Sequence, residues 1–258
     1  MAEAANKRVL QEDLIISVDE VKEIFLFGVN LSDDNGNPFP ERMFEFYIRA
    51  AQDWFETELG GLTLCPRQIN EQHDYRLTDY MTYNFLKLFR FPVQSVEKVS
   101  IQYPLSEDIL TFDDSWYRVE SVGAHVNLFP TQGTFSSILL SQGGSYLPLI
   151  YSGIEYVPHM MNVQYTAGFQ KGQIPTNIKE VIGMKAALGP LNIAGDLIAG
   201  AGIASKSLSI DGLSQSIGTT SSATNSGYGA RIIQYNKEIE ERIKKLKTYY
   251  LGLNMVVA

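Results

Sequence analysis

Cysteine, histidine and positive charge are all scarce in this sequence. Its 258 residues include one cysteine, Cys65, and three histidines, and the formal net charge is −8. A single cysteine excludes an intramolecular disulfide framework and any CxxC metal or redox motif. An acidic chain does not offer the basic surface needed to cover nucleic-acid phosphates tightly, so we expect no specific DNA or RNA binding.

Long uninterrupted hydrophobic runs are also missing. The longest apolar stretch, residues 181–204, contains Lys185, Pro190 and Asp196, which make it a poor membrane span. The first 14 residues carry no apolar segment of the signal-peptide kind. The composition is that of a globular protein, with 45% hydrophobic and 19% charged residues. We therefore expect the hydrophobic core to be stable without a metal or a disulfide. We also expect that the protein has no membrane partner.

Helical patterns begin near the N-terminus. Ser17 and Glu20 have the spacing of a capping box, which predicts a short helix to about Phe27. A longer helix is predicted over residues 41–59. Its two adjacent apolar stripes are Met43, Tyr47, Ala50, Trp54 and Phe44, Ile48, Ala51, Phe55, Leu59. A helix this apolar is buried over most of its circumference, and its second stripe is a candidate for contact with another subunit.

Two further helices are predicted near the C-terminus. Residues 174–177 open the first, and Pro190 should break or kink it. Residues 230–251 form the clearest helix of the chain. They carry an apolar residue every seven positions at Ile232, Ile239 and Leu246. Residues 231–247 hold six basic and three acidic side chains, a net charge of +3 in an acidic protein.

The middle of the chain has the pattern of strands. Between residues 65 and 170, short β-branched and aromatic runs alternate with turns and prolines. The runs are 85–89, 96–103, 116–119, 126–129, 137–140 and 161–166. This pattern predicts a mostly antiparallel sheet or a small sandwich inserted between the helices.

The resulting fold class is α+β: N- and C-terminal helices form a helical bundle, with a central β insertion and an extended arm. The arm is residues 205–229, which are rich in Ser, Thr and Gly with isolated hydrophobic residues. We expect it to become ordered only when docked. The predicted segments are 1–64, 65–170, 171–204, 205–229 and 230–258.

Candidate catalytic or metal-binding groups are sparse. None of the three histidines, His73, His125 and His159, has the helical spacing to a second ligand that a metal site would show. Residues 71–74, Glu-Gln-His-Asp, could supply a base and an orienting acid, but a solvated strand edge or turn is the favoured interpretation.

The remaining acidic and thiol groups have simple structural interpretations. Residues 33–37 lack the glycine and glutamate positions of a calcium loop and are expected to form a turn. Asp113 and Asp114 are expected to lie in a loop, and Cys65 is expected to be a core thiol. We predict no catalytic residue, no cofactor and no metal.

Three segments occur in a characteristic order. Residues 17–61 give a capped helix, a loop and a helix containing IRAAQDWFETELG; residues 88–99 read LFRFPVQSVEKV; and residues 163–175 run from VQYTAGF to Ile-Pro. In this order they resemble the head–tail connector (adaptor) proteins of long-tailed bacteriophages. Members of that family are often shorter, and the resemblance does not extend to the tail at 191–258.

The resemblance implies a structural role without covalent chemistry. It implies a ring, commonly of twelve copies, seated under the portal protein in the neck of a virion that is assembled in the host cytoplasm. The ring extends the channel for passing double-stranded DNA and gives the next neck or tail protein a docking platform. An acidic channel would let DNA pass without holding its phosphates.

Two sets of residues are the candidate contacts. The first is the C-terminal helix, which is expected to contact the portal or an adjacent subunit through Arg231, Ile232, Lys237, Ile239, Ile243 and Leu246. The second set, Leu208, Ile210 and Leu213, is expected to anchor the arm on a neighbour.

Three alternatives stay open. One is another neck protein, such as a stopper or tail-completion protein. Another is a β-sandwich that binds glycans through exposed aromatic residues such as Trp116, Tyr117 and Tyr146. The third is an enzyme that uses His73 or Asp114.

Overall fold

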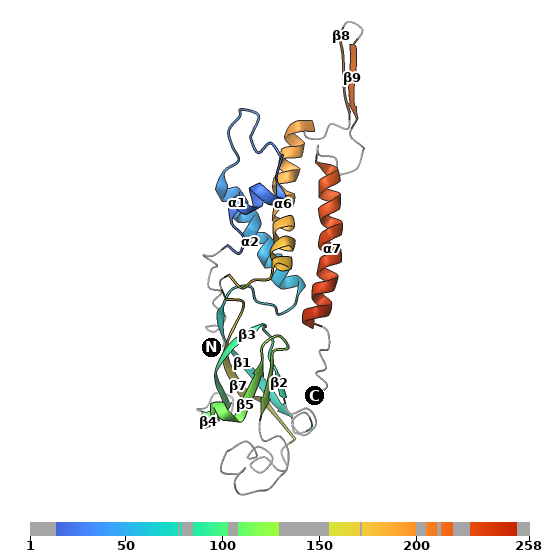
Figure 1. The fold of residues 1–258 in the computed structure, drawn as a ribbon. Coiled ribbons are helices and arrows are strands. Elements are labelled where there is room, and N and C mark those ends of the chain that lie inside the picture. Colours follow the sequence, from blue (N-terminus) through green and yellow to red (C-terminus); the bar gives the residue numbers. More distant parts are fainter. Residues whose placement is uncertain are drawn as a thin grey trace. The chain divides into compact units, whose positions relative to one another are not determined.

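The computed structural model describes residues 14–76, 78, 85–102, 108–128, 155–170, 172–199, 205–210, 213–218 and 228–251. The chain divides into two compact units (Figure 1). The helical unit combines Glu12–Leu59 with Ile174–Tyr249, and the β unit consists chiefly of Gly60–Gln173. Helices and antiparallel sheets together confirm the α+β class. The strand predicted at 137–140 lies outside the described residues.

The helical unit begins with the predicted capping box. The Ser17 hydroxyl accepts a hydrogen bond from the Glu20 amide at 3.1 Å, and the Ser17 amide donates to the Glu20 carboxylate at 2.8 Å. These bonds start α1 (Val18–Glu20), which continues directly into a π-helical turn, η1 (Val21–Phe25). Val21, Phe25 and Leu26 are buried, so this segment contributes one face to the core of the unit.

The long helix α2 (Glu41–Glu58) buries one of its two predicted stripes completely. Its members are Phe44, Ile48, Ala51 and Phe55, followed by Leu59 at the C-cap. The other stripe is only partly covered, and α6 (Thr176–Ala199) supplies two of its contacts. The Tyr47 ring lies against Gly189, and the Lys185 ammonium is 4.5 Å from the centre of the Trp54 ring.

Helix α6 continues through Pro190, so the break that the sequence suggested does not occur, whereas a kink at this residue stays a prediction. Proline removes one main-chain hydrogen bond and costs about 3 kcal/mol inside a helix. Here Ala187, Pro190 and Leu191 are all buried, and α6 packs along α2. Burial of the apolar residues on both sides of the proline offsets the lost bond.

Helix α7 (Gly229–Leu251) lies beside α6 in Figure 1, and side-chain bonds join it to three segments of the helical unit. Near its N-terminus, the Tyr235 hydroxyl donates to the Phe25 carbonyl at 2.8 Å, and Arg231 donates to the Phe27 carbonyl at 3.1 Å. Further along, Arg242 pairs with Glu180 of α6, and Lys247 pairs with Glu58 of α2 at 2.7 Å. Polar contacts thus hold the helix at both ends.

The β unit contains two antiparallel sheets. The larger has the order β1-β7-β3-β4, and the smaller has the order β2-β6-β5. The bounds are β1 (Arg67–Arg76), β2 (Phe85–Lys87), β3 (Val93–Gln102), β4 (Asp108–Thr111), β5 (Tyr117–Glu120), β6 (His125–Leu128) and β7 (Tyr156–Ala167). Residues such as Val99, Val126 and Val163 form its interior.

Within residues 205–229, two strands pair with each other. β8 (Ser205–Ile210) and β9 (Leu213–Gly218) form an antiparallel hairpin in which Ser205 is opposite Gly218 and Ile210 is opposite Leu213. An antiparallel two-stranded hairpin is an extended structure, but whether this segment acts as an arm stays a prediction.

Candidate interaction surfaces

The described part of the chain holds no group of three or more His, Cys, Asp and Glu side chains that could bind a metal ion. Among the same residues, none of the helices has the length and hydrophobicity needed to span a membrane. Two features of the described residues stand out: a polar network in the β unit and exposed apolar side chains on the helical unit.

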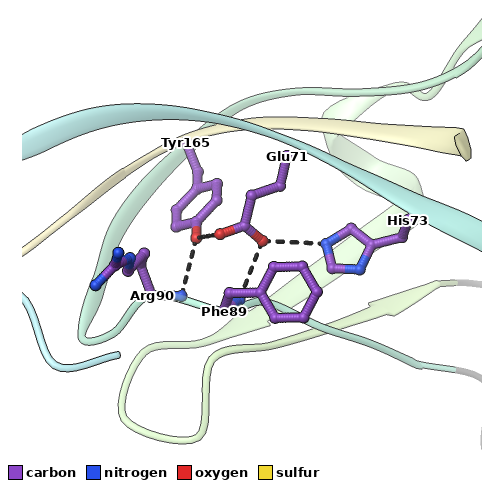
Figure 2. A network of polar contacts seen from close by, with 5 residues as sticks. All are labelled: Glu71, His73, Phe89, Arg90 and Tyr165. Carbon is purple, nitrogen blue, oxygen red and sulfur yellow. Dashed lines mark hydrogen bonds and ion pairs between the residues drawn. The ribbon is translucent and has the colours of Figure 1, made fainter. Parts of the chain in front are cut away.

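The main polar network surrounds Glu71 of β1 (Figure 2). The sequence favoured a solvated strand edge or turn at this position, but Glu71 is only 8% exposed. Its carboxylate accepts hydrogen bonds from the Tyr165 hydroxyl and, at 3.0 Å, from the Phe89 amide. The same carboxylate oxygen that contacts Phe89 lies 3.1 Å from Nε2 of His73.

Tyr165 extends this network to the next main-chain amide. Its hydroxyl oxygen accepts a bond from the Arg90 amide at 3.1 Å while its hydrogen goes to Glu71. Burial, and then the neighbouring carboxylate, raise the pKa of Tyr165, so it stays a protonated donor. Two consecutive amides, those of Phe89 and Arg90, are thereby tied to strands β1 and β7. The network therefore fixes the main chain at Phe89 and Arg90, between β2 and β3. The Phe89 ring stacks on His73 and remains mostly exposed.

The acidic residues considered as catalytic candidates have structural partners. Asp113 caps the short 3-10 helix η2 (Asp114–Trp116) by accepting from the amide of Ser115 at 2.9 Å, and Asp114 accepts from the Tyr117 hydroxyl at 2.8 Å. In the loop at 33–37, Asp33 accepts from the amides of Asn35 and Asn37, which makes the predicted turn. The Asn37 side-chain amide also donates to Asp33, and the Ser115 hydroxyl donates to Asp113. These side-chain bonds, and then the main-chain bonds, lower the pKa values of Asp33 and Asp113, so both are ionised acceptors.

The other predicted chemical candidates are dispersed. His125 lies 3.5 Å from Glu120 of the neighbouring strand, whereas the His159 amide donates to Asp74 of β1. Tyr117, proposed as an exposed glycan-binding aromatic residue, is buried instead. Trp116 packs edge-on against Phe112, and Tyr146 lies outside the described residues.

The apolar residues predicted to dock α7 are already covered by their own subunit. Ile232, Ile239, Ile243 and Leu246 are each 4–7% exposed. Arg231 is half-buried and bonded to Phe27, whereas Lys237 is exposed. The contact of α7 with a portal or a second subunit stays a prediction, and the side of the helix that could make it carries Ile233 and Lys237.

The predicted arm anchors fall at defined positions of the hairpin. Leu208 is opposite Gln215, and Ile210 is opposite Leu213. Because alternate residues of a strand belong to opposite faces, the register assigns Leu208, Ile210 and Leu213 to one face of the hairpin. Their docking on a neighbour is untested and stays a prediction.

The most exposed large apolar residues of the helical unit were not singled out from the sequence. They are Phe27 (76%), Phe46 (66%), Ile24 (63%), Tyr249 (59%) and Ile233 (57%). For Ile24 the reason lies in η1, where the Leu26 amide bonds to the Val21 carbonyl five residues earlier. A turn closed in this way is wider than an α turn, so it returns Phe25 and Leu26 to the face of Val21 and leaves Ile24 outside.

Comparison with solved structures gives distant likenesses. No family model and no curated protein matches the chain significantly. Among solved structures, a chain in the neck of an empty gene transfer agent particle computed with C6 symmetry is 14% identical, with a TM-score of 0.42 over 67% of this chain and 76% of that chain.

Two further solved structures are similar to the same degree. A chain in the virion of a native gene transfer agent is 13% identical with a TM-score of 0.44, over 67% of this chain and 76% of that one. A chain in the neck of the native particle computed with C12 symmetry is 13% identical with a TM-score of 0.37, over 56% and 67%. Likenesses at this level do not establish a shared fold, so function has to be inferred from the residues of the chain itself.

Proposed function

We propose that this protein is a structural head-to-tail connector of a tailed phage. Copies would form a ring below the portal that extends the DNA channel and presents a docking surface to the next neck or tail protein. The proposal starts from three sequence segments, 17–61, 88–99 and 163–175. Their sequences and their order along the chain resemble those of connector proteins.

The observation that carries the proposal is the exposed apolar surface of the helical unit. Its core receives buried side chains from η1, α2, α6 and α7. Even so, Ile24, Phe27, Phe46 and Ile233 stay more than half exposed. These large exposed apolar side chains support the proposal as candidate contacts with another protein, provided that they form one continuous patch in the assembled ring.

The charge distribution suits the same role. Residues 14–59 contain ten acidic and three basic side chains, a net charge of −7, whereas α7 carries six basic and three acidic ones. An acidic ring offers no array of cations to hold DNA phosphates, so DNA can pass. For α7, we propose that Ile233 and Lys237 contribute to the contact with the portal or an adjacent subunit, because its four apolar residues with heptad spacing are buried.

The test is to deplete the protein in cells that produce the particle and to examine the products by electron microscopy. A connector is required after DNA packaging, so filled heads without tails are expected. Supplying the wild-type chain should restore tailed particles. Supplying the I24D/F27D variant should not, although its mutations lie on an exposed surface and should leave the fold intact. Complete tailed particles after depletion would refute the proposed function.

A further inference from the structure

The hairpin β8–β9 has two chemically different faces. Residues that pair in register, and every second residue from them, share a face of an antiparallel hairpin. One face therefore contains all four large apolar residues of the two strands together with Lys206 and Gln215, and the opposite face contains only serines and Gly218. The apolar residues are Leu208, Ile210, Leu213 and Ile217.

Such a hairpin needs a partner. A two-stranded hairpin is marginally stable by itself in water, and sheets of this size become stable when one face packs on another element. Because serines occupy one face and the Leu and Ile residues the other, the Leu and Ile face is the one expected to pack on a partner. The only charge in the two strands is Lys206, which the register places on the apolar face.

A surface with complementary properties exists on the outward side of α1 and η1. Ile24 and Phe27 are 63% and 76% exposed there. Asp19 and Glu23 are also exposed; Glu23 lies in η1, and Phe27 lies in the turn that follows η1. The nearest basic residue in sequence, Lys22, is 3.7 Å from Glu41 and lies over the Phe44 ring. Arg231 of α7 is half-buried and donates to the Phe27 carbonyl at 3.1 Å, so one positive charge also lies at this side. With two exposed carboxylates, Asp19 and Glu23, against this one guanidinium, the outward side is apolar with a small excess of negative charge.

We propose that the apolar face of β8–β9 of one copy packs on Ile24 and Phe27 of a second copy, with Lys206 directed to the carboxylates of Asp19 and Glu23. The occupant is a second copy because the chain itself carries both halves of the contact: a small apolar face with one positive charge, and an exposed apolar surface with negative charges. The serine face then remains in water. This inference rests on the proposed ring and names the contact that closes it.

The contact has a defined symmetry. It joins two different surfaces, so it is heterologous, and repeating it generates a ring if the rotation closes. Each copy would give one hairpin and receive one. Two copies that exchange hairpins reciprocally would also satisfy this condition, so the size of the wild-type assembly distinguishes a ring from a dimer. Two variants that each destroy one half of the contact test the contact itself.

The experiment uses the full chain in three forms. The first is the wild type, the second is the face variant I24D/F27D, and the third is the hairpin variant L208D/L213D. Mass photometry and sedimentation velocity give the size of each form and of a 1:1 mixture of the two variants. Circular dichroism and thermal unfolding confirm that the variants keep the wild-type helical unit.

The expected result is specific to a heterologous contact. The wild type forms species larger than a dimer, and each variant alone remains monomeric. The mixture forms a 1:1 heterodimer and nothing larger, because only one intact hairpin can meet one intact face. A charge swap adds a milder probe: K206E should weaken association about 2- to 5-fold, and adding E23K should restore part of it.

Two outcomes would overturn the inference. If both variants assemble like the wild type, the hairpin and this face do not form the contact. The connector function is tested separately, by the depletion experiment. If the wild type stays monomeric at ~100 μM and the mixed variants form no heterodimer, a second copy is not the occupant, again without bearing on the depletion result.

Discussion

Gly183 of α6 faces the ring of Phe25 in η1 so closely that a Cβ atom at position 183 would overlap the ring. Six residues further along α6, Gly189 meets the ring of Tyr47 in α2 in the same way. The two glycines let α6 receive an aromatic ring from each of two other elements. This close packing requires two glycines inside a long helix, and glycine has a low helix propensity.

We predict that Gly183→Ala destabilises the helical unit even though alanine is the better helix former. The gain in helix propensity is at most about 1 kcal/mol, whereas forcing a methyl group into a filled site costs about 1–3 kcal/mol. The free energy of unfolding in urea should therefore fall. The control is Asn192→Ala at an exposed position of α6, which should be neutral or slightly stabilising. Equal stability of the two variants would contradict the prediction.

The bond from Tyr235 to the Phe25 carbonyl supports a second prediction. Tyr235→Phe keeps the half-buried ring but removes the hydroxyl that satisfies this carbonyl. We expect the free energy of unfolding to fall by about 0.5–1.5 kcal/mol. Amide hydrogen exchange in the N-terminal half of α7 should become faster. Asn236→Ala, at the adjacent exposed position, should be neutral or slightly stabilising and should not speed the exchange. Unchanged exchange in Tyr235→Phe would show that the bond does not hold the helix.

The helices could be predicted well from the sequence because their signals are local. Each signal lies within its own element: the capping box in α1, the apolar stripe in α2 and the heptad positions in α7. The π turn could not be predicted, because it follows from the packing of Phe25 and Leu26 against the rest of the unit. It also decides that Ile24 is exposed, and Ile24 is one of the residues on which the proposed contact depends.

Two other features differ in how well the sequence pattern indicates them. Strand β1 reads Arg-Gln-Ile-Asn-Glu-Gln-His-Asp-Tyr-Arg, which is too polar to indicate that Glu71 is buried. Its burial depends on donors from Tyr165 and Phe89, which are distant in sequence. The hairpin did have a local signal, since Asp211-Gly212 between two alternating runs is typical of a two-residue hairpin connection.

A third prediction separates packing from docking on α7. Ile239 is buried and Ile233 is exposed, although both are isoleucines of one helix. Ile239→Ala should cost about 2–5 kcal/mol of the free energy of unfolding, because it leaves a cavity. Ile233→Ala should stay within about 0.5 kcal/mol of the wild type. Denaturant unfolding checks both values, and a similar cost for the two substitutions would contradict the assigned orientation of α7.

The last prediction concerns stability at alkaline pH. The pKa of Tyr165 is raised by burial and by Glu71, whereas in the unfolded chain it is close to its usual value of about 10. Above pH 10 the unfolded chain therefore releases the Tyr165 proton while the folded chain keeps it. Unfolding becomes more favourable as the pH rises, by up to about 1.4 kcal/mol per pH unit from this residue. The stabilising contribution is fully present below pH 10.

Tyr165→Phe should remove this part of the pH dependence. Its free energy of unfolding at neutral pH should be lower, because the hydrogen bond to the carboxylate is lost, but the decline between pH 10 and 11.5 should be shallower than in the wild type. Glu71→Gln is the matched control: it removes the charge but leaves Tyr165 buried, and burial is the larger cause of the raised pKa. The steep decline should therefore persist in Glu71→Gln. Urea unfolding at several pH values measures all three slopes, and identical slopes for the wild type and Tyr165→Phe would show that Tyr165 is ionised as readily in the folded as in the unfolded chain.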